Sequence, residues 1–359
     1  MGLQSLDIRD FRNIQNASLT FSSGLNLITG ANAAGKTSLL EAIYCLGRVR
    51  SFRTSIVDEP VRYGQTAYRL VGRVRREQGR SVPIGIERQA SGLQVHLDGQ
   101  VIRRLSDLAG SFPVQVMSGD TDSILEGGPR YRRQAIDWAL FHVEHPYREH
   151  WQRYTRALRQ RNAALRSRVA VEQVRAWDAE MLETGEQIDK LRKQYFETLQ
   201  PKLQAVLSDL LPGMTVSLHY QSGWPAGLTL SEALDRSMER DRIRGYTQPG
   251  VHRGDFRILV NERAVRAHCS RGQQKAVTVG FMLGQIGLQQ DRNVALGAFL
   301  LDDFASELDE AHQERVLCAL RDLQAQVFVT AIEGIGTNHQ TWEDTQRFHV
   351  EHGEIQEVV

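Results

Sequence analysis

Cysteine is scarce in this chain of 359 residues, which contains three. Cys45, Cys269 and Cys318 lie far apart, with no CxxC pair and no cysteine–histidine spacing typical of a zinc site. Zinc sites need closely spaced ligands, and small secreted domains need several cysteine pairs. The cysteine pattern therefore argues against a zinc site and against a disulfide framework.

Long apolar runs are absent as well. No stretch approaches the ~18 uninterrupted apolar residues of a membrane-spanning helix. The N-terminal segment MGLQSLDIRDF has no basic region followed by an apolar one, and Leu6 stands where a myristoylation signal has serine or threonine. We predict a soluble, cytoplasmic protein with no membrane partner.

The chain also lacks an excess of one charge. Its 44 basic and 43 acidic residues give a net charge of +1, so no whole-molecule field attracts a polyanion. Only five basic residues are lysines, and genome composition alone can raise the arginine count. A lysine at a motif position is therefore more informative here than an arginine.

The N-terminal third has the patterns of strands around one helix. Residues 3–8 and 19–29 alternate or run apolar as strands do, and a glycine turn then leads into helical spacing over residues 38–46. Residues 67–102 have the turn signals of a meander of short strands. These patterns predict a strand, a glycine turn and a helix in direct succession.

The middle of the chain changes to helical patterns. From about residue 129 onward, Tyr147, Trp151, Tyr154 and Leu158 recur at spacings of one helix face. A near-heptad pattern over residues 174–195 predicts a second helix, which we expect Pro201 to end. The two helices predict an antiparallel hairpin. A strand at 215–220, a helix at 230–244 and apolar strands at 298–301 and 327–330 follow.

Residues 30–37 read GANAAGKT and fit the phosphate-loop pattern G-x-x-x-x-G-K-[ST] between a strand and a helix. In such a loop, backbone N–H groups enclose the phosphates, the lysine contacts the β and γ oxygens, and the hydroxyl binds Mg²⁺. We therefore predict ATP and Mg²⁺ as cofactors. The candidate ATP contacts are Gly30, Ala31, Asn32, Ala33, Ala34, Gly35, Lys36, Thr37 and Ser38.

A partner carboxylate is expected after an apolar strand, and FLLDD at residues 299–303 supplies two. Asp302 is the candidate Mg²⁺ ligand together with Thr37. Asp303 is the candidate catalytic carboxylate that polarises water. Because it is one methylene shorter than the glutamate of fast hydrolases of this architecture, we expect slow hydrolysis.

The long separation between Lys36 and Asp302 indicates an ATPase head that an insertion divides. We predict an α/β head formed by residues 1–115 and 214–359, with mixed sheets, and a helical arm at 116–213. Residues 305–309, ASELD, continue the motif, and capping of the next helix is the default role of Ser306 and Asp309.

The segment SRGQQ at residues 270–274 stands at the start of an apolar helical run. Ser270 and the N–H groups of Gly272 and Gln273 predict an anion-binding helix end, to which Arg271 adds charge. The alternative is an ordinary capped helix.

In this order, the phosphate loop, SRGQQ and LLDDFASELD resemble the bacterial RecF family, which is related to SMC proteins. FRN at residues 11–13, GPRYRR at 128–133 and GVHR at 250–253 support the resemblance, which spans the chain. The resemblance implies an ABC/SMC-type ATPase head with an inserted helical arm. It also implies that Arg12 and Asn13 contact the nucleotide.

The resemblance further implies how such a head works. Residues 270–273 (Ser270, Arg271, Gly272 and Gln273) meet the γ-phosphate of ATP that is bound to a second copy, so ATP drives homodimer formation. The closed dimer holds double-stranded DNA near a single-strand junction and acts with RecR and RecO to help load RecA in recombinational repair. Weak, DNA-stimulated ATP hydrolysis then releases it.

Two positions depart from the usual pattern of ABC-type ATPases. No clear Q-loop glutamine is present, because Gln115 lies inside a strand-like run. Thr330 stands where many relatives have a switch histidine, and we predict a hydroxyl contact to the γ-phosphate.

Arginine clusters offer candidate DNA contacts, because phosphate attraction needs clustered positive charge. Arg153, Arg156 and Arg159 share one face of the first arm helix, whose alternative role is pairing with the acidic second helix. The meander supplies a second cluster, which includes Arg73, Arg75 and Arg76. No base-reading module is evident.

Two other functions stay open at this stage. A P-loop small-molecule kinase would use the arginines to clamp a phosphorylated acceptor, but it leaves SRGQQ without a role. A structural scaffold with a degenerate site would depend on neither ATP nor Lys36.

Overall fold

The computed structural model describes residues 1–76, 79–102, 108, 110–118, 124–292, 294, 296–304, 308–332 and 342–358. The chain forms two compact units. The first comprises Met1–Asp122, Asp209–Leu211 and Ser270–Val359, and the second comprises Ser123–Ser208 and Pro212–Cys269.

An antiparallel sheet in the first unit has the strand order β2-β1-β4-β5-β6-β7. Its strands alternate between buried apolar and exposed polar side chains, so one face packs on the core and the other meets solvent. The predicted meander of short strands is confirmed. The strands are β1 (Gly2–Phe11), β2 (Ile14–Thr20), β4 (Tyr68–Arg75), β5 (Ser81–Gln89), β6 (Gly92–Leu97) and β7 (Gln100–Val101).

The second sheet of this unit has the order β15-β14-β3-β13-β12-β8 and is parallel except for the β14–β15 hairpin. Its central strands β12 and β13 are buried along their whole length, as expected for a sheet covered on both faces. The strands are β3 (Leu25–Thr29), β8 (Val114–Met117), β12 (Ala298–Leu301), β13 (Val327–Ala331), β14 (Thr345–Glu351) and β15 (Glu354–Val358).

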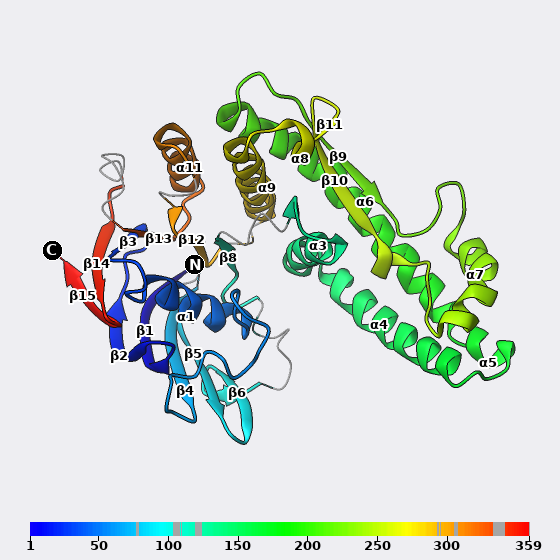
Figure 1. The fold of residues 1–359 in the computed structure, drawn as a ribbon, viewed down its shortest axis with the longest axis horizontal. Coiled ribbons are helices and arrows are strands. Elements are labelled where there is room, and N and C mark those ends of the chain that lie inside the picture. The colour runs from blue at the N-terminus through cyan, green and yellow to red at the C-terminus, as the bar shows by residue number, and fades with distance from the viewer. Residues whose placement is uncertain are drawn as a thin grey trace. The chain divides into compact units, whose positions relative to one another are not determined.

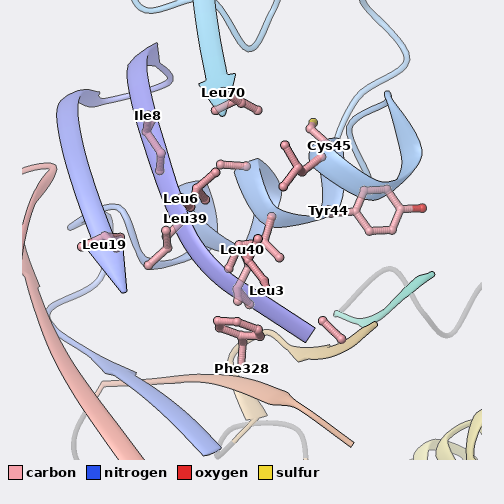
Figure 2. Close-up of a cluster of buried hydrophobic side chains, with 14 of the residues drawn as sticks. Leu3, Leu6, Ile8, Leu19, Leu39, Leu40, Tyr44, Cys45, Leu70 and Phe328 are labelled. Atoms are coloured by element: carbon pink, nitrogen blue, oxygen red, sulfur yellow. The ribbon is translucent and has the colours of Figure 1, made fainter. Parts of the chain in front are cut away.

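Helix α1 (Lys36–Arg48) follows β3 and lies in the main hydrophobic core between the two sheets. Figure 2 shows Leu39 and Leu40 of α1 close to Leu6 of β1 and to Phe328 of β13. Because α1 starts at the phosphate loop, this core fixes the direction of the loop's helix. Two further helices, α9 (Arg271–Asp291) and α11 (Glu310–Asp322), pack against each other.

The second unit contains the predicted helical hairpin, in which α4 and α6 run alongside each other (Figure 1). A three-stranded antiparallel sheet of order β11-β10-β9 belongs to the same unit. The helices are α3 (Pro129–Val143), α4 (His145–Arg166), α5 (Val171–Arg175), α6 (Asp178–Leu210), α7 (Leu230–Arg244), α8 (Val265–His268) and the 3₁₀ turn η2 (Val251–Arg253). The strands are β9 (Val216–Gln221), β10 (Asp255–Val260) and β11 (Arg263–Ala264).

Two expectations about this unit were wrong. Pro201 lies inside α6, which continues to Leu210 because Leu199, Leu203 and Leu207 keep an apolar face buried beyond the proline. The C-terminal boundary of the arm also differs, since residues 212–269 belong to the second unit and not to the head. The reason is that β10 contacts α3 and α7 contacts α4.

The family segment GPRYRR contacts the residues that directly follow GVHR inside the second unit. Arg132 forms a bidentate pair with Asp255, with distances of 2.7 and 2.9 Å. Arg133 donates to the carbonyl of Gly254 at 2.9 Å. The fully buried Arg192 donates to Asp137 at 2.8 Å and to the carbonyl of Val251 at 2.7 Å. These arginines hold the helices to the strand and turn around residue 254.

No helix among the described residues is both long enough and apolar enough to cross a membrane.

Candidate nucleotide-binding site

The phosphate loop connects β3 to α1 and depends on two glycines. Gly30 has a φ of +151°, and a Cβ there would lie 2.2 Å from the carbonyl oxygen of Val350 in β14. Gly35 has a φ of +125°, and a Cβ there would lie 2.8 Å from Nδ2 of Asn13. Both positions require a residue without a side chain, for conformation and for space.

Lys36 lies at the first turn of α1 with its side chain inside the loop. Its ammonium group donates to the carbonyls of Gly30 at 2.8 Å and Ala31 at 2.9 Å. The side chain is therefore held across the loop, where the N–H groups at the helix start also point. This arrangement concentrates positive potential at one place.

Three side chains from different strands and helices meet at the C-terminal edge of the parallel sheet. Thr37 Oγ1 donates to Asp302 Oδ1 at 3.0 Å, and Thr330 Oγ1 donates to the same oxygen at 2.8 Å. The Thr330 hydroxyl in turn accepts the backbone N–H of Asp303 at 2.7 Å. The fully buried Thr330 thus links the two aspartates. It was predicted to contact a γ-phosphate, and that contact stays a prediction.

The two aspartates differ in environment. Burial raises the pKa of the Asp302 carboxyl, as does the neighbouring Asp303 charge, whereas the hydrogen bonds from Thr330 and Thr37 lower it. Asp303 is exposed and has a φ of +51°, an uncommon conformation for a residue with a side chain. Strained backbone conformations of this kind cluster at functional sites.

The donor set fits Mg²⁺. A threonine hydroxyl and a carboxylate are oxygen ligands, and Mg²⁺ combines one or two protein ligands with water and phosphate oxygens. Within the described residues, no group of three or more histidine, cysteine, aspartate or glutamate side chains forms a separate metal cluster. Thr37 and Asp302 would hold the ion.

Arg12 and Asn13 contact different parts of the segment formed by the phosphate loop and α1. Asn13 Nδ2 donates to the carbonyl of Ala34 at 2.9 Å, so it braces the loop directly. Arg12 forms a bidentate pair with the fully buried Glu41 of α1, at 2.7 and 2.9 Å, and also contacts Glu59. Its observed role is to fix α1, and nucleotide contact by either residue stays a prediction.

Ser270 caps helix α9. Its hydroxyl accepts the N–H of Gln273 at 3.3 Å, while the Gln273 side chain accepts the N–H of Ser270 at 2.9 Å. This reciprocal capping box is the ordinary structural role that the sequence left open. In the described part of the chain, no hydrogen bond joins residues 270–273 to residues 30–38. The contact with phosphate stays a prediction.

The remaining motif positions have simple roles. Asp309 caps α11 by accepting the N–H of His312 at 2.9 Å, which confirms capping as its default role. Ser306 lies outside the described residues. Gln115 is buried in β8 beside Phe299, and neither polar atom of its side chain has a hydrogen-bond partner among the described residues.

The two arginine clusters have different environments. Arg153 forms ion pairs with Glu180 at 2.7 Å and Glu183 at 3.0 Å on the second arm helix, which was the alternative to DNA contact. Arg156 and Arg159 are exposed, and Arg159 donates to the Thr155 carbonyl at 3.3 Å.

The meander cluster divides in two. Arg73 and Arg75 are exposed on the open face of the antiparallel sheet, whereas Arg76 donates to Ser111 at 3.0 Å. Sequence reasoning missed Arg9, which lies opposite Arg69 on that same face. The strand alternation of β1 was the signal that could have placed it there.

Comparison with known proteins bears on this site. A family model described as "RecF/RecN/SMC N terminal domain" matches residues 2–353. The protein named DNA replication and repair protein RecF in Erwinia tasmaniensis is 39% identical over 356 residues, which cover 99% of this chain and 98% of that protein. The chain belongs to the RecF family. The Nitrosococcus oceani protein of the same name is 38% identical and covers all of both chains.

Solved structures of RecF proteins have the same fold as this chain. A structure titled as the recombination mediator protein RecF with ATP in the RecFOR pathway has a TM-score of 0.89 at 26% identity, covering 100% of this chain and 98% of that one. An Smc head has a TM-score of 0.63 at 15% identity, covering 100% and 97%, and shows the fold alone. The predicted ABC/SMC-type ATPase head is confirmed. Full-length similarity to RecF proteins disfavours the small-molecule kinase.

Proposed function

We propose that this protein is an ATP-controlled DNA clamp of recombinational repair and replication-fork maintenance. Two copies close on ATP, hold double-stranded DNA near a junction with a single strand, and open again on slow hydrolysis. The observation that carries the proposal is the convergence of Thr37, Asp302, Thr330 and Asp303 beside the phosphate loop. The solved RecF relative whose title includes ATP supports the choice of nucleotide.

The phosphate loop and its helix bind the ATP triphosphate in this proposal. Lys36 exchanges its two carbonyl partners for phosphate oxygens, which are stronger acceptors because they are charged. Thr37 and Asp302 would hold Mg²⁺, which would neutralise charge on the phosphates. Asp303 accepts a proton from the attacking water, and Thr330 holds the peptide N–H that positions this aspartate.

The exposed start of α9 is the part of the site that a second copy uses. Ser270 and Arg271 are exposed, and a Cβ at Gly272 would meet nothing within 4 Å. The chain's own packing therefore does not require glycine at this position. A glycine there does allow close approach of a phosphate from another copy to the helix N–H groups.

The open face of the antiparallel sheet is our candidate for part of the DNA-contacting surface. Arg9, Arg69 and Arg73 are exposed on it, with Arg9 opposite Arg69. Contacts of this kind bind phosphates without reading bases, so retention falls steeply with salt. The relatives' titles support a place in the RecFOR pathway, in which we propose that the clamp acts with RecR and RecO to help load RecA.

ATP-dependent retention on duplex, gapped and single-stranded DNA tests the proposal. We expect wild-type protein to be retained on duplex and gapped DNA with ATP, and Lys36→Met to lose retention and dimer formation. Asp303→Asn is the matched variant, because it keeps the phosphate loop and is expected to stay trapped on DNA. If Lys36→Met behaved like wild type, the protein would be a scaffold with a degenerate site.

A further inference from the structure

The second compact unit has a groove of about 410 Å³ that the ATP-clamp proposal does not use. Helix α7 lines one part and the loop between β9 and α7 lines another, together with residues 248–249. The groove is lined by Trp224, Pro225 and Leu228 from the loop and by Arg236 and Arg240 from the helix, among others. Its lining contains two arginines and no carboxylate.

The helical wall follows from the spacing of α7. Ala233, Arg236, Ser237 and Arg240 recur at three or four residues and share one face. The Ser237 hydroxyl is buried and donates to the Leu234 carbonyl at 3.1 Å, so its hydrogen-bonding capacity is used within α7. The two arginines are therefore the charged groups that this wall presents to the groove.

Local hydrogen bonds and one close backbone approach hold the loop wall. The indole N–H of Trp224 donates to the Leu228 carbonyl at 3.1 Å. Gly223 has a φ of +97°, and a Cβ there would lie 2.3 Å from the Gly250 carbonyl oxygen. A capping box between Thr229 and Glu232 then starts α7. A preformed groove loses little conformational freedom when a ligand enters it.

Positive charge predominates in the groove lining, although α7 carries the carboxylate of Glu232 one turn before Arg236. Hydrogen bonds from Thr229 lower the pKa of Glu232, and the Arg236 charge lowers it further. Arg236 and Arg240 are exposed, and in the described part of the chain neither forms an ion pair or a hydrogen bond at its guanidinium. Elsewhere on α7, Asp235 pairs with Arg175 and Glu239 with Arg242. Two like charges four residues apart on a helix repel each other. An anionic ligand relieves this repulsion.

We propose that the groove binds an acidic peptide segment of a partner protein. An apolar side chain of the segment lies on Trp224, Pro225 and Leu228, and neighbouring carboxylates pair with Arg236 and Arg240. Guanidinium groups bind carboxylates in bidentate geometry, and a groove of this volume is the size of known small-ligand sites. Duplex DNA would offer phosphates to the two arginines, but its bases stay stacked inside the double helix and place no apolar group on Trp224, Pro225 and Leu228. The combination therefore favours a peptide over duplex DNA.

A labelled synthetic peptide, Asp-Asp-Glu-Leu-Phe, tests the proposal by fluorescence anisotropy with the full-length protein up to about 1 mM. Two control peptides replace Leu-Phe by Gly-Gly or the acids by lysine. We expect the first peptide to bind and each control to bind at least about tenfold more weakly. Arg236→Glu with Arg240→Glu is expected to weaken the first peptide by at least about tenfold as well.

The matched control is Arg242→Glu with Arg244→Glu, a double charge reversal on the same helix outside the groove. It is expected to keep the peptide affinity within about twofold. Both double variants are expected to keep wild-type circular dichroism and ATP-dependent DNA retention, which separates this proposal from the clamp.

Three results would overturn the acidic-peptide groove: no binding of the first peptide, equal weakening by both double variants, or equal binding of the glycine control. Loss of DNA retention in the Arg236/Arg240 variant without any peptide binding would assign the groove to nucleic acid instead.

Discussion

Replacement of Thr330 by valine removes the hydroxyl that links the two aspartates while nearly preserving side-chain shape. The hydroxyl donates to a carboxylate in a fully buried position, and hydrogen bonds to charged groups contribute about 1.5–3 kcal/mol. The variant also leaves the Asp303 N–H without this acceptor, at a cost of about 1–3 kcal/mol. We expect the local unfolding free energy to fall by roughly 3 kcal/mol, because water or relaxation of the turn compensates for part of the two costs.

The assay is native-state hydrogen exchange at β13 and at the Asp303 amide, because a chain of two compact units has no single unfolding free energy. Thr330→Ser is the matched variant, since it keeps the hydroxyl and loses one buried methyl, which costs about 1 kcal/mol. The hydroxyl argument therefore predicts that valine destabilises more than serine. The reverse order, with serine the less stable variant, would refute it and assign Thr330 a packing role.

Other changes have equally definite outcomes. Arg12→Ala leaves the buried Glu41 carboxylate without its main partner. We expect it to lower the local unfolding free energy of α1, measured by hydrogen exchange, by about 3 kcal/mol. A decrease below about 1 kcal/mol would show that the remaining partners of Glu41 suffice. Burial lowers the pKa of His252 to about 4, below its ordinary 6.5, so the folded state favours the neutral ring. The second unit is therefore destabilised as pH falls from about 6.5 through 4, because the unfolded chain binds a proton that the folded unit disfavours. We expect the unfolding free energy of the second unit to fall by about 3 kcal/mol over that pH range, and His252→Gln to abolish this pH dependence. A His252→Gln variant with the wild-type pH profile would contradict the argument. Gly30→Ala forces a Cβ against the Val350 carbonyl and is expected to abolish ATP binding in calorimetry, and wild-type affinity would show that the loop relaxes freely.

The local motifs were predictable from the sequence because each is a short residue pattern that requires one particular backbone conformation. The phosphate loop required glycine at positive φ, as Gly30 and Gly35 show. Thr37 and Asp302 were expected to act together although they are far apart in sequence, because a phosphate loop needs a partner carboxylate after an apolar strand. The structure brings them together at the C-terminal edge of the parallel sheet.

Other features depended on partners that no local pattern specifies. Helix α6 continues through Pro201 because burial of the leucines on either side stabilises it by more than the one lost backbone hydrogen bond costs. The role of Arg12 followed from Glu41, whose carboxylate faces it from another element. Residues 212–269 belong to the arm because β10 contacts α3 and α7 contacts α4, and sequence spacing cannot reveal these contacts.

The central claim is that ATP is shared between two copies, and mixing two defective variants tests it most directly. Lys36→Met lacks a working phosphate loop, and Ser270→Arg lacks a working α9 start. If the site is shared, neither variant dimerises alone with ATP, but an equimolar mixture forms heterodimers with one complete site. Light scattering in the presence of a non-hydrolysable ATP analogue is expected to show a dimer only in the mixture. A mixture that stays as monomeric as its separate components would contradict the shared site.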